Sequence, residues 1–401
     1  MHRTKTIGLG QILFLLVSIC SVGQMTNTIY APAMSNIGRY FGVEPTRVQL
    51  VMAAYLFPYG FSQFFYGPLS DRFGRRPLLL IGLIIYLVGA SIALSAPVFH
   101  LLIIGSFLQG CGIGVGGVML RTVLRDLYYG VKLHKASSYI SIAMIFAPIM
   151  APMVGGSLAH YLGWRSIFIF LFCLAAIVGM IQFFMFPETN PHKGSEQTRL
   201  RYVKSSYATV LSNRRFLGYM VCLLVGFGGV SVFEASAGIL FTDVLHFTPL
   251  TGSLLYTIPM PAYLGGSYLS GWLSSRWETP QIVLLGIVFL MLGGIILLIL
   301  GIWMTTVLSI LVPVCCYFFG IGMVFPAGTA GALEPFSRLA GTAGAIMGGV
   351  QNVGASAATM ISSTMSQSSQ LPLAFILTGL SLLMGLAYYL FLHERSDNKD
   401  Y

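Results

Sequence analysis

The chain has 401 residues, of which 56% are hydrophobic and only 8% are charged, and its formal net charge is +10. Soluble domains carry about 25% charged residues, so this composition excludes a water-soluble globular protein and indicates an integral membrane protein.

Twelve apolar runs follow one another along the chain. A helix of about 20 apolar residues crosses a hydrocarbon core about 30 Å thick, so each run is long enough to span a membrane. No small-residue cleavage site follows the first run, and we interpret it as a retained span. We predict an all-α polytopic membrane protein. The runs cover residues 7–30, 47–66, 77–96, 99–120, 136–159, 165–186, 216–241, 251–273, 281–301, 306–332, 340–363 and 372–392.

The positive charge is distributed unevenly between the two sides of these spans. If the N-terminus is cytoplasmic, 19 of the 22 Lys and Arg residues fall on the cytoplasmic side, and only Arg39, Arg47 and Arg165 fall outside. This is the positive-inside bias of a multi-pass membrane protein. It predicts that both termini are cytoplasmic and gives no support to nucleic-acid binding.

A charged stretch separates the second and third spans. Residues 67–77 read GPLSDRFGRRP, which resembles the signature loop G-x-L-x-D-R-x-G-R-R of the major facilitator superfamily at every fixed position. The resemblance implies twelve helices in two six-helix bundles. We expect Asp71 to begin span three, where a carboxylate complements the positive end of the helix dipole, and arginines to clamp it. The alternative is that the arginines only hold the loop inside. The predicted gate comprises Gly67, Asp71, Arg72, Arg75, Arg76, Arg121 and Arg125.

A polar, basic segment divides the spans into two sets of six. We predict an N-terminal bundle at 1–190, a cytoplasmic linker at 191–213 without a fold of its own, and a C-terminal bundle at 214–401. Shifting the signature by 204 positions reaches residues 271–276, GWLSSR, where Gly, Leu, Ser and Arg recur and Ser275 takes the place of Asp71. This similarity indicates a duplication, as in transporters built from two repeats around a central site.

Small residues and prolines mark two further spans. Residues 110–117, GCGIGVGG, lie inside span four, so they indicate close helix packing and not a dinucleotide-binding loop. Span five contains APMVGG at 151–156, which resembles the G-P-x-x-G-G element of the superfamily's antiporters with Ala151 in place of its first glycine. We predict a bent helix, although packing alone is an open alternative. The residues concerned are Pro148, Pro152, Gly155 and Gly156.

One acidic residue lies deep inside a span. Glu234 stands alone within residues 225–240, and an ionisable group at that depth normally faces a cavity or a partner. Burial favours the protonated form of a carboxyl, so Glu234 is our candidate for proton coupling. A neutral acid bonded between helices is the alternative, and Asp243 and Glu334 are the next candidates. Asn27 and Ser106 occupy positions where related exporters carry an acid and an arginine.

Polar and aromatic side chains of the first two spans complete a predicted substrate cavity. Tyr55 and Tyr59 are four residues apart and therefore share a helix face. Tyrosine suits a mixed cavity wall and its ring attracts cations, but packing explains these two residues equally well. We predict Gln24 and Asn27 of span one in the same cavity, together with Glu234.

Several segments resemble the drug:proton antiporter family of the superfamily more specifically. This resemblance implies proton-driven export of amphipathic or cationic hydrophobic drugs across the bacterial inner membrane. It also adds Tyr256 to the predicted cavity. We expect a monomer without cofactor or metal. A sugar symporter would require more buried polar groups, a membrane enzyme requires a catalytic motif that we do not find, and the two-part organisation disfavours a channel or receptor. The segments are residues 49–77, 109–126, 233–235, 334–336 and 340–349.

Overall fold

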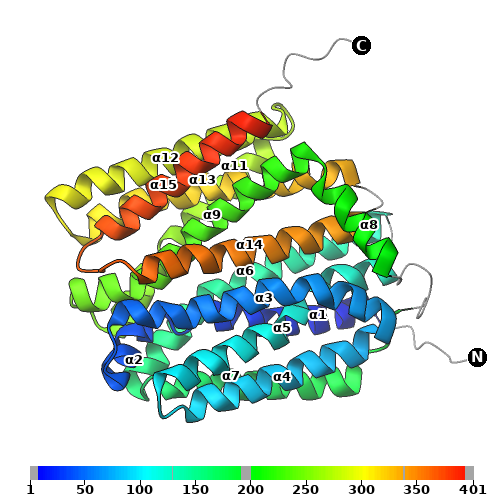
Figure 1. Cartoon of the computed structure of the whole chain (residues 1–401), viewed down its shortest axis with the longest axis horizontal. Coiled ribbons are helices and arrows are strands. Elements are labelled where there is room, and N and C mark those ends of the chain that lie inside the picture. The colour runs from blue at the N-terminus through cyan, green and yellow to red at the C-terminus, as the bar shows by residue number, and fades with distance from the viewer. Residues whose placement is uncertain (1–7, 129, 191–199, 337–338, 393–401) are drawn as a thin grey trace, which may run out of the picture.

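The chain folds into a bundle of long helices that run side by side (Figure 1). The computed structural model describes residues 8–128, 130–190, 200–336 and 339–392; the side chains of 45, 125, 130–135, 137–145, 200–204 and 340–341 also lie outside the description. Within the described ranges every regular element is helical. The predicted all-α class is therefore confirmed.

The N-terminal half begins with a span that is longer than its apolar run. After α1 (Leu9–Thr28) the chain continues through a 3-10 turn at Ala31–Ala33 into the short helix α2 (Met34–Phe41). Five further spans complete this half, which lies in the lower part of Figure 1. They are α3 (Pro45–Phe73), α4 (Arg75–Ser95), α5 (Phe99–Leu127), α6 (Gly130–Tyr161) and α7 (Arg165–Met185).

The C-terminal half follows the helix α8 (Leu200–Leu211) and lies in the upper part of Figure 1. Its first span, α9 (Arg214–Ile239), ends in a π-helical turn at Leu240–Val244. Its second span is divided into α10 (Pro249–Thr257) and α11 (Pro259–Leu273), because Pro259 cannot continue the hydrogen-bond ladder of α10. The remaining spans are α12 (Thr279–Trp303), α13 (Val307–Leu333), α14 (Ala340–Ser363) and α15 (Leu371–Phe391).

In the described part of the chain, with α10 and α11 counted together and the short helices α2 and α8 left out, twelve helices form two bundles of six. The halves meet where α3 packs along α14 and where α6 packs against α10. α3 and α14 are absent from the eight helices whose length and hydropathy alone qualify them as membrane spans. Their Gly, Ser, Gln and Tyr residues lower the hydropathy, which is tolerated because the two helices pack along each other where the halves meet.

The predicted duplication is visible in how the third and fourth spans of each half pack. A Cβ atom at Gly82 of α4 would lie 2.6 Å from the carbonyl oxygen of Gly112 in α5, and one at Gly286 of α12 would lie 2.8 Å from that of Gly320 in α13. A side chain at these positions would therefore push the helices apart. The two halves use the same backbone contact.

Two sequence predictions about the segments between spans require correction. The linker at 191–213 contains α8, so the part from Leu200 has regular structure; residues 191–199 lie outside the description. The charged stretch at 67–77 is no open loop. α3 extends to Phe73 and α4 begins at Arg75, with only Gly74 between them at φ 104°, a backbone angle that favours glycine.

Apolar side chains cover the outer faces of the peripheral helices. Ile84 on α4, Phe184 on α7 and Trp303 on α12 are all more than half exposed. Exposed apolar surface of this extent is typical of a lipid-facing belt. We name the two ends of the bundle by their short helices: the α8 end lies at the right of Figure 1, and the α2 end lies at the left.

Candidate functional site

A cavity of about 730 Å³ lies between the two halves. Its wall includes residues of α1, α3, α5 and α6 from the N-terminal half and of α9, α11, α13 and α14 from the C-terminal half. Ligand sites between helix bundles have this position and this size. The cavity is therefore the candidate substrate site.

Glu234 of α9 lies in the wall of this cavity and is only 5% exposed. The side-chain amide of Asn27 on α1 donates a hydrogen bond to Oε2 of Glu234 at 3.3 Å. The hydroxyl of Tyr256, from the same half as Glu234, also interacts with the carboxyl, and Tyr30 lies close to it. The acid is thus contacted from both halves, by Asn27 of the N-terminal half and by Tyr256 of the C-terminal half.

Asn27 is suited to both protonation states of this acid. Its amide nitrogen donates to the carboxylate, while its Oδ1 atom is buried and has no partner. An amide that turns over offers Oδ1 as an acceptor to a protonated carboxyl. The pair Asn27–Glu234 can therefore keep one hydrogen bond whether or not the proton is bound.

Of the other predicted cavity residues, some line the cavity and others pack behind its wall. Gln24 and Tyr59 line the cavity, and Tyr59 is half-buried. Tyr55 also touches the cavity, but it is 1% exposed and its hydroxyl donates to the carbonyl of Gly23 at 2.7 Å. Tyr256 is not part of the wall; it stacks on Phe233 with ring centroids 5.9 Å apart. Tyr55 and Tyr256 thus support the wall from behind.

The cavity is covered at the α2 end by close contacts between the halves. A Cβ atom at Gly238 of α9 would lie 1.9 Å from the carbonyl oxygen of Ala31, so only glycine fits there. The hydroxyls of Ser35 and Thr242 are 2.6 Å apart. These contacts bring the end of α1 directly against the end of α9.

The proline–glycine element of α6 takes part in the same closure. α6 stays helical through Pro148 and Pro152. A Cβ atom at Gly155 would lie 1.7 Å from the carbonyl oxygen of Ile29, and one at Gly156 would lie 2.6 Å from the Cβ of Ser253 in α10. The glycines of this element allow close contact with α1 and with the other half, while Pro148 lines the cavity.

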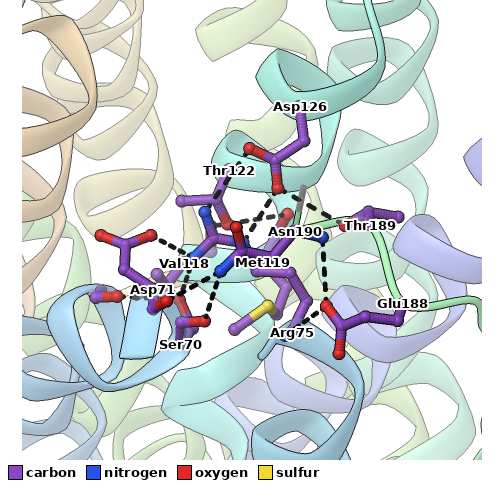
Figure 2. A network of polar contacts seen from close by, with 11 residues as sticks. Ser70, Asp71, Arg75, Val118, Met119, Thr122, Asp126, Glu188, Thr189 and Asn190 are labelled. Atoms are coloured by element: carbon purple, nitrogen blue, oxygen red, sulfur yellow. Dashed lines mark hydrogen bonds and ion pairs between the residues drawn. The ribbon is translucent and has the colours of Figure 1, made fainter. Parts of the chain in front are cut away.

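A second polar cluster lies at the α8 end, where Figure 2 shows Arg75 among three carboxylates. The Arg75 guanidinium lies 2.5 Å from Oδ1 of Asp71 and 2.9 Å from Oδ2 of Asp126, and it also donates to Ser70. Arg75 is 5% exposed. Because Asp126 comes from α5, this cluster ties the α3–α4 junction to the end of span four.

The predicted role of Asp71 at a helix start is wrong. Asp71 lies in the last turn of α3, and the first N–H of α4, that of Arg75, donates instead to Oε1 of Glu188 at 2.9 Å. Asn190 in turn donates to the carbonyl of Asp71 at 2.8 Å. The carboxylate at this helix start therefore comes from the segment after α7 (Figure 2).

The remaining gate residues lie apart from Asp71. Arg76 donates to the carbonyl of Phe183, and Arg72 lies over the ring of Phe73. Arg121 lines the cavity and donates to the carbonyl of Gly344 in α14. A Cβ atom at Gly67 would meet no atom within 4 Å. The side chain of Arg125 lies outside the described part of the structure.

Within the described residues, the hydrogen bonds and ion pairs of Asp71 and Arg75 join elements of the N-terminal half only, so in this conformation the cluster does not connect the halves. Arg121 does connect them, through Gly344. Glu188 and Asp126 were missed as functional candidates because their partners lie 113 and 51 residues away. The described residues contain no group of three His, Cys, Asp or Glu side chains that could hold a metal ion.

Comparisons with known proteins agree with this architecture. Residues 13–359 match the family model of the Major Facilitator Superfamily. The chain is 39% identical to the "Multidrug resistance protein D" of Escherichia coli over 97% of this chain and 96% of that protein. It is 27% identical to the "Bicyclomycin resistance protein homolog" of Haemophilus influenzae over 92% of each. The solved structure of a D-xylose-proton symporter is similar with a TM-score of 0.76 at 15% identity, over 95% of this chain and 97% of that one, which concerns the fold alone.

Proposed function

The chain belongs to the major facilitator superfamily and is a membrane transporter, not an enzyme; on this premise we propose that it exports amphipathic or cationic hydrophobic drugs in exchange for protons. The relatives named for multidrug and bicyclomycin resistance support drugs as the substrate class. The apolar and aromatic residues of the cavity wall suit such molecules.

The observation that carries the proposal is the position of Glu234. It is the acidic residue of the cavity wall, and Asn27 of the opposite half holds it. A carboxylate deep in the bundle needs a proton or a counter-charge. A proton and a cationic drug therefore compete for Glu234, and this competition couples the export of one to the entry of the other.

Alternating access requires that the halves open at one end while they close at the other. We propose that the close contacts of Gly156 with Ser253 and of Ala31 with Gly238, each of which joins the two halves, form the closure at the α2 end. At the α8 end, Arg121 and Gly344 provide a contact between the halves. The Asp71–Arg75 cluster is then a brace of the N-terminal half that moves as a unit with it.

We place the α8 end in the cytoplasm of a bacterium, with the bundle in the inner membrane and the chain acting as a monomer. Arg72, Arg75, Arg76, Arg214 and Arg215 lie at the α8 end, which supports this orientation through the positive-inside bias. Both halves of a single chain line the cavity, so no second copy is needed to complete it.

Proton release on drug binding tests the proposal directly. Purified protein in lightly buffered detergent solution is mixed with ethidium, a cationic drug, and the pH is followed with an indicator dye. Competition at one carboxyl predicts release of a proton at a pH where Glu234 is protonated. Ethidium that binds without releasing a proton at any pH between 5 and 9 would contradict the proposed coupling. Protein with Glu234→Gln serves as the control and is expected to release none.

A further inference from the structure

The cavity contains a cationic side chain that the proposed exchange of protons and cationic drugs does not use. Arg121 of α5 lines the cavity, and its side chain is accessible although it lies within the bundle. Its guanidinium donates a hydrogen bond to the carbonyl of Gly344 in α14. No described carboxylate forms an ion pair with it.

This arrangement leaves part of the guanidinium available to a ligand. A guanidinium has five N–H donors, and one carbonyl oxygen does not neutralise its charge. A charge held inside a helix bundle is costly unless it is paired. Around Arg121 the wall is formed by glycine and by neutral side chains such as Gln63, Leu120 and Thr329. Within the described residues no anion neutralises Arg121, so its guanidinium can accept an anionic ligand.

Arg121 and Glu234 lie at different depths of the same cavity. Glu234 is twenty residues from the start of α9, and Arg121 is six residues from the end of α5, and both of these helix ends lie at the α8 end. With a rise of about 1.5 Å per residue, the two backbone positions differ in depth by roughly 20 Å. An anion on Arg121 therefore avoids direct repulsion from Glu234.

We propose that Arg121 forms an anion subsite of the cavity, which takes the carboxylate or sulfonate of an amphipathic substrate. The apolar body of that substrate lies along Phe227, Ile321 and Phe325, which belong to the same wall. Cationic drugs use the end of the cavity at Glu234, and anionic amphiphiles use the end at Arg121. This inference rests on the proposed function, because it assigns a second substrate class to the same site.

A pair of probes that differ only in charge tests the subsite. Dansyl-leucine carries a carboxylate, and its methyl ester has the same apolar body without the charge. Binding of each is measured by dansyl fluorescence with the full-length protein in phosphatidylcholine nanodiscs at pH 7, against empty nanodiscs. Hydrogen bonds to charged groups predict that the wild type binds the carboxylate about tenfold to a hundredfold more tightly than the ester.

Three variants locate the effect. Arg121→Gln is expected to remove the preference for the carboxylate and to leave the ester unaffected, whereas Arg121→Lys retains most of the preference. Arg276→Gln is the matched control: Arg276 follows α11 at the α8 end, lies over the ring of Trp272 and is outside the cavity, so this variant is expected to bind both probes as the wild type does.

Equal affinities of the wild type for both probes would overturn the subsite, as would an Arg121→Gln protein that keeps the preference. If Arg121→Gln does not fold, the wild-type ratio and Arg121→Lys decide the question. Ethidium binding is measured in the same nanodiscs. A wild type that binds ethidium but shows no preference for the carboxylate refutes only the anion subsite, whereas a wild type that binds neither ethidium nor the ester refutes the proposed drug transport.

Discussion

The two halves of the molecule pack in the same way but carry different charges. The backbone contact of Gly82 with Gly112 recurs at Gly286 and Gly320, so the third and fourth spans approach equally closely in both halves. The acid–arginine brace around Arg75 has no such repeat, because Thr279 occupies the corresponding position 204 residues later. The two halves therefore share the packing of their third and fourth spans but differ in their charged residues.

The same comparison explains the centre of the cavity. Asn27 contacts Glu234, and Ser35 contacts Thr242, each pair being 207 residues apart. Ala31 contacts Gly238 with the same spacing. Under two-fold symmetry, residues near the axis meet their own counterparts. Asn27 and Glu234 are therefore counterparts. Asn27 stands where related exporters carry an acid in span one, and Glu234 supplies an acid at the equivalent position of the other half.

Removal of the Glu234 carboxyl is expected to have the largest effect on transport. It would also make the two halves alike at the axis. Glu234→Gln places an amide opposite the amide of Asn27 and leaves no proton acceptor in the cavity wall. We expect complete loss of uphill export of ethidium by reconstituted vesicles with an imposed pH gradient. Glu278→Gln is the control, because Glu278 is an exposed acid of the same half and no candidate for coupling. If Glu234→Gln still concentrates the dye, Asp243 or Glu334 becomes the coupling candidate.

Moving the acid across the axis tests whether the counterparts are equivalent. In the double variant Asn27→Asp with Glu234→Gln, the carboxylate lies in the N-terminal half and the amide in the C-terminal half. Aspartate is one methylene shorter than glutamate, so we expect recovery of uphill export to on the order of a tenth of the wild-type rate, a deficit of about 1.4 kcal/mol. A double variant as inactive as Glu234→Gln alone would mean that the coupling depends on the surroundings of α9 and not on the axis.

Most of the fold could be predicted because each apolar run is a membrane span, and the charged stretch before Arg75 marks the family. Element ends were less predictable. α3 continues to Phe73 because its charged last turn lies at the membrane face, where hydropathy no longer distinguishes helix from loop. The capping of α4 by Glu188 could not be predicted, since a contact over 113 residues leaves no local pattern.

The ion pairs of the two halves at the α8 end are expected to differ in their contribution to stability. The side chains of Arg75 and Asp126 are 6% and 17% exposed, whereas those of Arg215 and Glu334 in the C-terminal half are 46% and 65% exposed. Removing one partner of a buried ion pair costs about 3–5 kcal/mol, whereas an exposed pair contributes at most about 1 kcal/mol.

We therefore expect Arg75→Ala to lower the thermal midpoint of the detergent-solubilised protein clearly, and Arg215→Ala to leave it nearly unchanged. Size-exclusion chromatography after heating measures both midpoints on the same preparation. Equal midpoints for the two variants would show that the brace of the N-terminal half adds no stability. Asp71→Asn adds a test of gating: normal transport by this variant would exclude a latch that depends on the Asp71 carboxylate.

The smallest expected effects concern a pair of tyrosines that the duplication preserves in the cavity wall. Tyr59 of α3 and Tyr263 of α11 are 204 residues apart, and both are half-buried wall residues. A contact between a cation and an aromatic ring contributes about 0.5–2 kcal/mol. We expect Tyr59→Ala and Tyr263→Ala each to weaken ethidium binding by about twofold to thirtyfold. Neutral drugs are expected to bind as before, and the amount of folded protein should not change.

Tyr55 provides the contrast within the same helix, because its hydroxyl bonds to the carbonyl of Gly23 and the residue is buried. Tyr55→Phe removes this hydrogen bond, which predicts a loss of stability of about 1 kcal/mol without a change in drug preference. Binding of ethidium and of a neutral drug, together with the thermal midpoint, distinguishes the two roles. If Tyr59→Ala lowers folded protein and all drug affinities together, Tyr59 is a packing residue like Tyr55. If only Tyr263→Ala changes the affinity for cations, the two halves contribute unequally to the wall despite their shared packing.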